Sequence, residues 1–123
     1  MLNFILIAIG GACGATSRYG IGSFLKFYLN YNFYGTLVIN ILGSFFIGYI
    51  ISSGYLKNIS EDFTRYFLII GFLGSFTTFS AFSYEVIELF LSNKYFQSFL
   101  YAIISLLLCV AATLIGMYIN KVW

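Results

Sequence analysis

The residues with the clearest chemical use lie between Gly71 and Glu85, in the stretch Gly-Phe-Leu-Gly-Ser-Phe-Thr-Thr-Phe-Ser-Ala-Phe-Ser-Tyr-Glu. Phe79 and Phe82 are three positions apart, so a helix would place both rings on one side. The edge of a phenyl ring carries partial positive charge and attracts an anion weakly. Weak sites suit conduction, because an ion must leave a site as readily as it enters. Such rings also pack against lipid or other helices, so only their combination with polar neighbours predicts a path for a small anion.

The polar neighbours of this path would be an amide and hydroxyl groups. Asn40 stands near the middle of an apolar run, and Ser80 directly follows Phe79. A buried amide needs hydrogen-bond partners in hydrocarbon. Two interpretations of Asn40 therefore stay open: it holds helices together, or it faces a water-filled path together with the Ser80 hydroxyl.

Residues 74–78, Gly-Ser-Phe-Thr-Thr, predict an interruption of the helix that carries the two rings. Non-helical backbone at membrane depth persists only where it is buried in protein or lines a wet cavity. The carbonyl groups freed by such a break can coordinate a cation. If two antiparallel copies of the chain met at this break, they would supply these oxygens in pairs, enough for a small monovalent ion.

The composition is that of a membrane protein. The chain has 123 residues, of which 61% are hydrophobic and 8% charged, and it contains no proline and no histidine. Four spans of about 20 residues use most of this length, so we expect one all-α domain covering residues 1–123. The expected spans are residues 2–27, 34–52, 61–91 with a break near 74–78, and 95–120. We expect the first to be a retained span, not a cleaved signal peptide, and Ser60 to cap the third.

Catalysis is poorly supported by the side chains of these spans. General acid and base chemistry needs histidines or paired carboxylates, and the chain has no histidine. Glu85 and Glu88 lie toward the end of the third span, and the other spans contain no acid. We therefore expect neither an enzyme nor a proton-coupled transporter.

The fourth span carries a weakly polar stripe. Tyr101, Ser105, Cys109 and Thr113 recur every four residues, a spacing that keeps them along one side of a helix. Cys13 and Cys109 lie far apart in apolar runs, so neither a disulfide framework nor a metal site is indicated.

The basic residues divide evenly between the two sides of the membrane. One side would receive Lys57, Arg65 and Lys121, and the other Arg18, Lys26 and Lys94. Because basic residues orient membrane proteins, this tie predicts copies inserted both ways up that pair as an antiparallel, dual-topology homodimer; a monomer oriented by another feature is the alternative. Arg18 either reaches the membrane interface or faces an aqueous vestibule. The net charge of +2 is too small and scattered for nucleic-acid binding.

Three segments resemble the Fluc (CrcB) family of fluoride channels along essentially the whole chain. They are Gly11–Tyr19, Gly35–Phe45 and Gly71–Phe82, and the Thr-Thr-Phe-Ser-x-Phe element in the third is the most specific. The resemblance implies an antiparallel, dual-topology dimer with two fluoride pores in the bacterial inner membrane. It also implies a structural sodium ion at the dimer centre, held by the backbone carbonyls of Gly74 and Thr77.

The resemblance further assigns roles to residues and to the protein. It implies the following pore residues: Asn40, Phe79, Phe82, Tyr101, Ser105 and Thr113. Arg18 matches the basic residue of the first motif. Cys109 departs from the family pattern, because a hydroxyl is expected there, and Ser75 and Phe76 depart from its glycine-rich break. The implied function is passive export of cytoplasmic fluoride, which gives resistance to fluoride.

Two other classes of protein share the size of this chain. Small four-span drug or cation exporters need an acidic residue in the first span, and residues 2–25 contain none. A structural subunit without its own pathway is the second class, and ion flux through liposomes that hold only this chain would separate it from a channel.

Overall fold

The computed structural model describes residues 1–29, 32–53 and 60–119, and the elements in these ranges are helical. They are α1 (Leu2–Leu29), α2 (Asn32–Ser52), the π-helix η2 (Phe63–Leu73), the short α3 (Gly74–Phe76), α4 (Phe79–Leu91) and α5 (Tyr95–Ile119). Within these ranges, four stretches are long and apolar enough to cross a membrane, namely Leu2–Tyr28, Tyr34–Ser52, Phe63–Leu91 and Tyr95–Ile119. The chain is therefore a multi-pass membrane protein. Lys57 and Lys121, used in the charge comparison above, lie outside the described residues.

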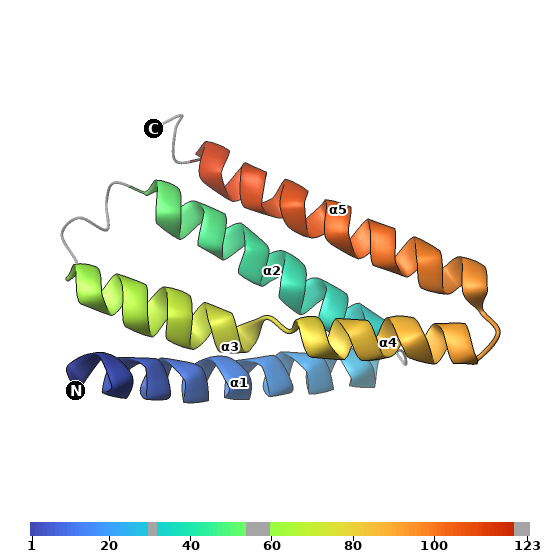
Figure 1. Cartoon of the computed structure of the whole chain (residues 1–123), viewed down its shortest axis with the longest axis horizontal. Helices are drawn as coiled ribbons and strands as arrows, with labels where there is room; N and C mark the ends of the chain where they lie inside the picture. Colours follow the sequence, from blue (N-terminus) through green and yellow to red (C-terminus); the bar gives the residue numbers. More distant parts are fainter. Residues whose placement is uncertain (30–31, 54–59, 120–123) are drawn as a thin grey trace.

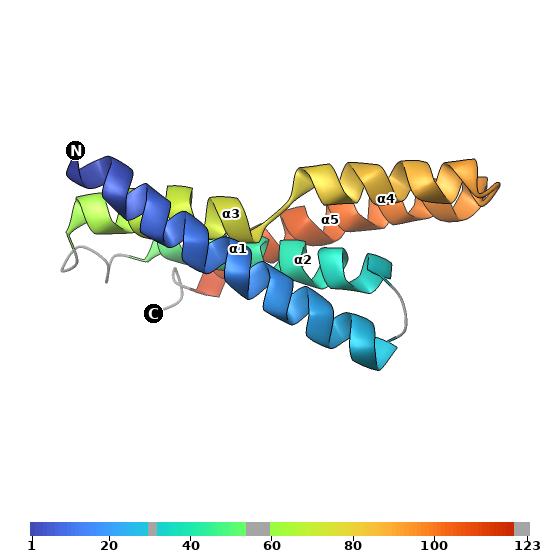
Figure 2. The same cartoon turned by 90° about the horizontal axis from the view of Figure 1, so that it is seen from below.

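The described helices form two packed pairs, and the broken third span contacts both of them. α1 lies along η2, and α2 lies along α5, as Figure 1 shows. Beyond the break, α4 leaves α1 and continues beside α5, so the C-terminal half of α1 diverges from α4 (Figure 2). The break thus transfers the third span from one helix pair to the other.

Glycines allow the helices of each pair to approach closely. A Cβ added at Gly48 or at Gly116 would collide with backbone carbonyl oxygens of the facing helix, those of Thr113 and Phe45 respectively. In α1, a Cβ at Gly10 would meet the backbone of η2. Small residues at such crossings are typical of membrane helices, where dispersion forces and weak hydrogen bonds replace the hydrophobic effect.

Both ends of the third span carry the helix-capping features that their residue types predict. The Ser60 hydroxyl accepts a hydrogen bond from the Phe63 backbone N–H at 3.1 Å, which confirms the predicted N-cap. At the other end, Asn93 adopts a left-handed conformation with φ of 60°, and Lys94 N–H donates to the Leu89 carbonyl. This is the backbone reversal that ends a helix.

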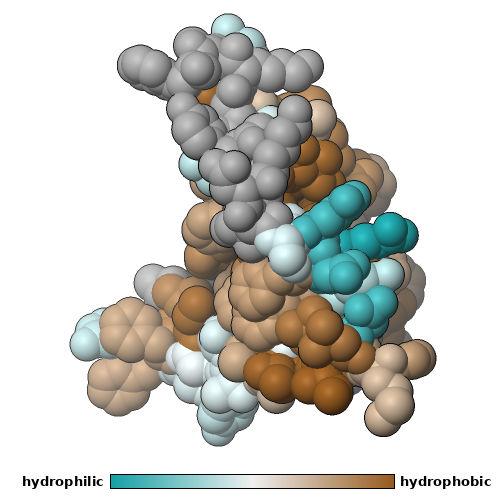
Figure 3. Space-filling model, turned by 90° about the vertical axis from the view of Figure 1, so that its left-hand side faces the viewer, coloured by the Kyte–Doolittle hydropathy of each residue, from teal (hydrophilic) through white to brown (hydrophobic). Residues whose placement is uncertain are grey.

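The outer surface of the helices is apolar, unlike that of a soluble protein. Large apolar side chains are exposed along α1 and α5. Among the described residues, the interior is shared by five apolar residues and by the polar residues Thr36, Thr78, Glu85, Ser98 and Ser105. The exposed charged residues Glu61, Asp62 and Arg65 precede or begin η2. At that end of the molecule, Figure 3 shows hydrophilic side chains gathered beside an apolar surface. The buried polar groups are therefore the ones to examine for a site.

Candidate functional site

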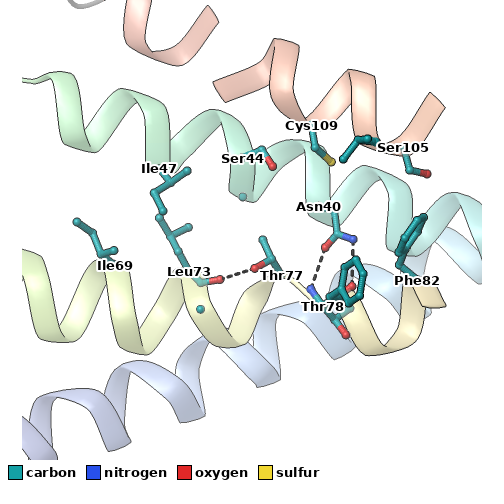
Figure 4. A pocket seen from close by; sticks show the side chains of 14 residues that line it. Asn40, Ser44, Ile47, Ile69, Leu73, Thr77, Thr78, Phe82, Ser105 and Cys109 are labelled. Carbon is teal, nitrogen blue, oxygen red and sulfur yellow. Dashed lines mark hydrogen bonds between the residues drawn. The ribbon is translucent and has the colours of Figure 1, made fainter. Parts of the chain in front are cut away.

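A groove of about 380 Å³ lies where the broken third span faces α2 and α5. Its lining is apolar apart from a few amide, hydroxyl and thiol groups, and the described lining residues include no charged side chain. It is lined by Asn40, Gly43, Ser44, Ile47, Ile69, Leu73, Gly74, Thr77, Thr78, Phe79, Phe82, Ser105, Leu106 and Cys109 (Figure 4). The groove therefore offers neutral hydrogen-bonding groups in an apolar environment.

The backbone is extended at Thr77 and Thr78, between α3 and α4. Their φ and ψ angles are −79° and 155° at Thr77 and −148° and 114° at Thr78. These two residues lie inside the segment 74–78 in which the sequence predicts an interruption. Because an extended residue cannot continue the helical hydrogen-bond ladder, nearby N–H and C=O groups need other partners.

Asn40 supplies two of those partners. Its side-chain oxygen accepts a hydrogen bond from the Thr78 N–H at 2.8 Å, and its Nδ2 donates to the Thr78 carbonyl at 3.1 Å. The amide thus pairs with one peptide unit on each side of Thr78, as a neighbouring strand would (Figure 4). Asn40 joins α2 to the break, which is the first of the two interpretations. It also lines the groove, and its role in an anion path stays a prediction.

Two threonine hydroxyls complete the local hydrogen bonding. Thr78 Oγ1 accepts from the Ala81 N–H at 3.2 Å and so caps α4. The Thr77 hydroxyl donates to the Leu73 carbonyl at 3.0 Å. Each threonine therefore stabilises the helix end next to it.

The bonds to Asn40 and to the Thr78 hydroxyl take the usual N–H donors away from two carbonyl groups. In a continuous α-helix, the carbonyl of Gly74 would accept from Thr78 N–H, and that of Thr77 from Ala81 N–H. Here Thr78 N–H donates to Asn40, and Ala81 N–H donates to the Thr78 hydroxyl. Gly74 and Thr77 both line the groove, and they are the residues whose carbonyls the family resemblance assigns to sodium.

Gly43 provides the space that the break occupies. A Cβ added there would collide with Thr77 Cγ2 and would lie 3.4 Å from Phe76 Cδ1. Gly43 and Asn40 are neighbours on one side of α2. This side of α2 therefore both admits the broken segment and bonds to it.

Phe79 and Phe82 both line the groove, as their spacing predicts. Their ring centroids are 5.5 Å apart, and the ring planes are tilted by 47°. Phe79 is 77% exposed, whereas Phe82 is half-buried and its ring lies 5.7 Å from that of Tyr101. Phe82 is held by α5, and Phe79 projects from the surface of the single chain.

A buried carboxylate next to the groove was not among the predicted site residues. Glu85 is 7% exposed. Its Oε1 accepts from the Thr36 hydroxyl at 2.5 Å, and its Oε2 accepts from the Tyr101 hydroxyl at 2.6 Å. The cluster therefore links α4 to both α2 and α5. A signal was present in the sequence, because Glu85 follows Phe82 by three positions and Thr36 precedes Asn40 by four.

The remaining predicted residues lie at or beyond the edge of the groove. Of the stripe on α5, Ser105 and Cys109 line it, while Tyr101 bonds to Glu85, and the Thr113 hydroxyl bonds to the Cys109 carbonyl at 3.1 Å. Ser80 is exposed, and its hydroxyl lies 3.1 Å from that of Thr78. Arg18 is half-buried on α1 and is outside the described lining.

The fold and the site together define a small multi-pass membrane protein with a neutral groove at a helix break. Comparison with known proteins gives the family. A model of the CrcB-like proteins, described as Camphor Resistance (CrcB), matches residues 5–117, and the chain belongs to this family.

Several relatives are similar to the chain over nearly its whole length. A protein of Campylobacter lari is 42% identical, over 98% of this chain and 100% of the relative. One of Gloeothece citriformis is 41% identical, over 98% of both chains. One of Dehalococcoides mccartyi is 38% identical, over 98% of this chain and 94% of the relative. Each of these three is named a fluoride-specific ion channel FluC.

Proposed function

We propose that this protein is a fluoride-selective ion channel that exports cytoplasmic fluoride passively, and not an enzyme. The family of the chain and the names of its relatives support this function. Hydrogen fluoride crosses membranes as a neutral molecule and dissociates inside the cell, so a passive path for the anion lets fluoride leave and gives resistance.

The observation that carries the proposal is the chemistry of the groove lining. Phe79, Phe82 and Asn40 line it together with Ser44 and Ser105, and no charged side chain is among the described lining residues. Hydroxyl and amide groups donate hydrogen bonds to an anion, and ring edges attract it weakly. Neutral donors hold a small anion less tightly than lysine or arginine would, so the anion can move on. Ser80, Tyr101 and Thr113 extend this set of polar groups beyond the groove, and Arg18 would draw anions toward the entrance.

The channel assembles as an antiparallel, dual-topology homodimer in the bacterial inner membrane. The equal division of basic residues supports insertion in both orientations. The exposure of Phe79, at 77%, and the open groove beside it support a second copy on this face. In the dimer the break between α3 and α4 lies at mid-membrane depth, where irregular backbone must be covered by protein or line a cavity.

A sodium ion at the dimer centre is the proposed structural cofactor. The carbonyls of Gly74 and Thr77 fit it, because their usual N–H donors are bonded elsewhere and both residues line the groove. Hard monovalent cations prefer oxygen ligands such as these. When bound, the ion would hold the two breaks together by supplying positive charge to carbonyls that no helix satisfies.

Fluoride efflux from liposomes that contain only the purified chain tests the function. We expect rapid efflux of fluoride and slow efflux of chloride from matched vesicles. Vesicles that retain fluoride as well as protein-free vesicles do would contradict the proposal. Equal rates for the two anions would contradict selectivity.

A further inference from the structure

Hydroxyl groups beside the groove form a chain of hydrogen bonds that ends at Glu85. This carboxylate is 7% exposed, and it accepts from the Thr36 hydroxyl at 2.5 Å and from the Tyr101 hydroxyl at 2.6 Å. The Tyr101 side chain is also hydrogen-bonded to that of Ser105, which lines the groove. The chain of bonds therefore runs from the wall of the groove to a buried carboxylate and joins α2, α4 and α5.

The direction of this chain follows from the number of hydrogens that each group carries. A hydroxyl group has one hydrogen to donate, and an ionised carboxylate only accepts. Because the hydroxyl hydrogen of Tyr101 goes to Glu85, Ser105 is the donor in its bond to Tyr101. The hydroxyl hydrogens of Thr36, Tyr101 and Ser105 are thus all directed along the chain toward Glu85, and none of these three is left for another acceptor.

We propose that Glu85 is a positioning residue that withholds these hydroxyl hydrogens from the permeating anion. Fluoride and the carboxylate are both anions that accept hydrogen bonds from hydroxyl groups, so they compete for the same donors. When Ser105 turns to donate to fluoride, the new bond is offset by the loss of the Ser105–Tyr101 bond. The competition keeps anion binding shallow, which lets the ion leave. This inference rests on the proposed fluoride-channel function.

Glu85→Gln tests the proposal, with Glu88→Gln as the matched control. The new amide can accept from Thr36 and donate to Tyr101, so the Tyr101 hydrogen can turn to Ser105 and the Ser105 hydrogen is released. Fluoride efflux from liposomes is measured against fluoride concentration. We expect the half-saturating concentration to fall about two- to tenfold, the effect of one hydrogen bond. Glu88 is exposed one turn further along α4, so its variant should match the wild-type chain.

Tyr101→Phe separates the chain of hydroxyls from the charge of the carboxylate. This change removes the link between Ser105 and Glu85 and keeps the negative charge. It should therefore also lower the half-saturating fluoride concentration, and it decides alone if the Glu85→Gln protein does not fold. If Glu85→Gln shifts this concentration and Tyr101→Phe does not, the charge acts on the anion directly and the proposal is overturned.

Thermal unfolding in detergent, with potassium fluoride or potassium chloride, separates this inference from the channel function. We expect fluoride to raise the unfolding temperature more in Glu85→Gln than in the wild-type chain or in Glu88→Gln. If Glu85→Gln instead lowers stability and efflux at every fluoride concentration without moving the half-saturating value, Glu85 only joins helices and the proposal is overturned. If the wild-type chain conducts no fluoride, the channel function fails, while the unfolding temperatures still decide whether Glu85 competes with fluoride for donors.

Discussion

Asn40 has the most completely defined bonding of any residue in the groove, because both atoms of its amide bond to Thr78. Replacing Asn40 with Ala would leave an N–H and a carbonyl of the break without partners. We expect a loss of about 1–3 kcal/mol in the free energy of unfolding, measured by thermal unfolding in detergent. Ser44→Ala is the control, since Ser44 also lines the groove one turn further along α2. Equal stability of the two variants would show that these bonds do not hold the break.

Asn40→Asp separates bonding from charge. A carboxylate can still accept from the Thr78 N–H, but it cannot donate to the Thr78 carbonyl, and it brings negative charge into a groove whose described lining has none. We expect this variant to lose more fluoride efflux than Asn40→Ala does, although its free energy of unfolding is no lower, because the added charge repels the anion directly. Normal efflux from this variant would mean that Asn40 only connects helices.

The two phenylalanines differ in how they are held, and this predicts different consequences for the same substitution. Phe79→Ile should lower fluoride efflux roughly tenfold, equivalent to about 1.4 kcal/mol in the barrier, with little change in stability, because the ring projects from the chain. Phe82→Ile should lower efflux and also stability, because its ring packs near that of Tyr101. Phe4→Ile, at an exposed position on α1, is the control. Unchanged efflux in both groove variants would show that the two rings do not line the fluoride path.

At the level of helices, the packing of α2 against the break depends on the absence of a side chain at Gly43. Gly43→Ala would drive a methyl group into Thr77 and toward Phe76. Overpacking of this kind costs about 1–3 kcal/mol, so we expect lower thermal stability and lower fluoride efflux. Gly20→Ala is the matched control, because a Cβ there meets nothing within 4 Å and alanine favours helix by about 0.5–1 kcal/mol. Equal effects of the two changes would contradict the close approach of Gly43 to Thr77.

The local features of the elements could be predicted from the sequence, and the pairing between them could not. Ser60 and the extended pair Thr77 and Thr78 follow from residue types known to cap or interrupt helices. The π-helical winding of η2 was not predicted, since its mostly apolar residues would suit an ordinary α-helix equally well. The hydrogen bonds of Glu85 were also missed, because Thr36 and Tyr101 are brought to it by the packing of two other helices.

At the scale of the whole molecule, the single chain leaves the face that carries the groove uncovered. The groove is open, and Phe79 beside it is exposed, while lipid would cover the apolar outer faces of α1 and α5. Composition predicts the membrane location, because apolar residues exceed what a small interior can bury. The proposed second copy on the open face would depend on orientation in the membrane, which is set by the charges in the loops and not by the fold.

This dependence on loop charge gives a test of the dual-topology dimer. With four spans, the six basic residues of the sequence would divide three to three between the two sides, so two lysines inserted between Ser53 and Ser60 would favour one orientation. If only antiparallel pairs conduct, the biased form alone should show fluoride efflux close to that of empty vesicles. Co-expression with a second form, biased the other way by two lysines beside Lys94, should restore efflux, because each orientation then finds its partner. Full activity of the first form alone would contradict the antiparallel dimer, since a population facing one way cannot build it.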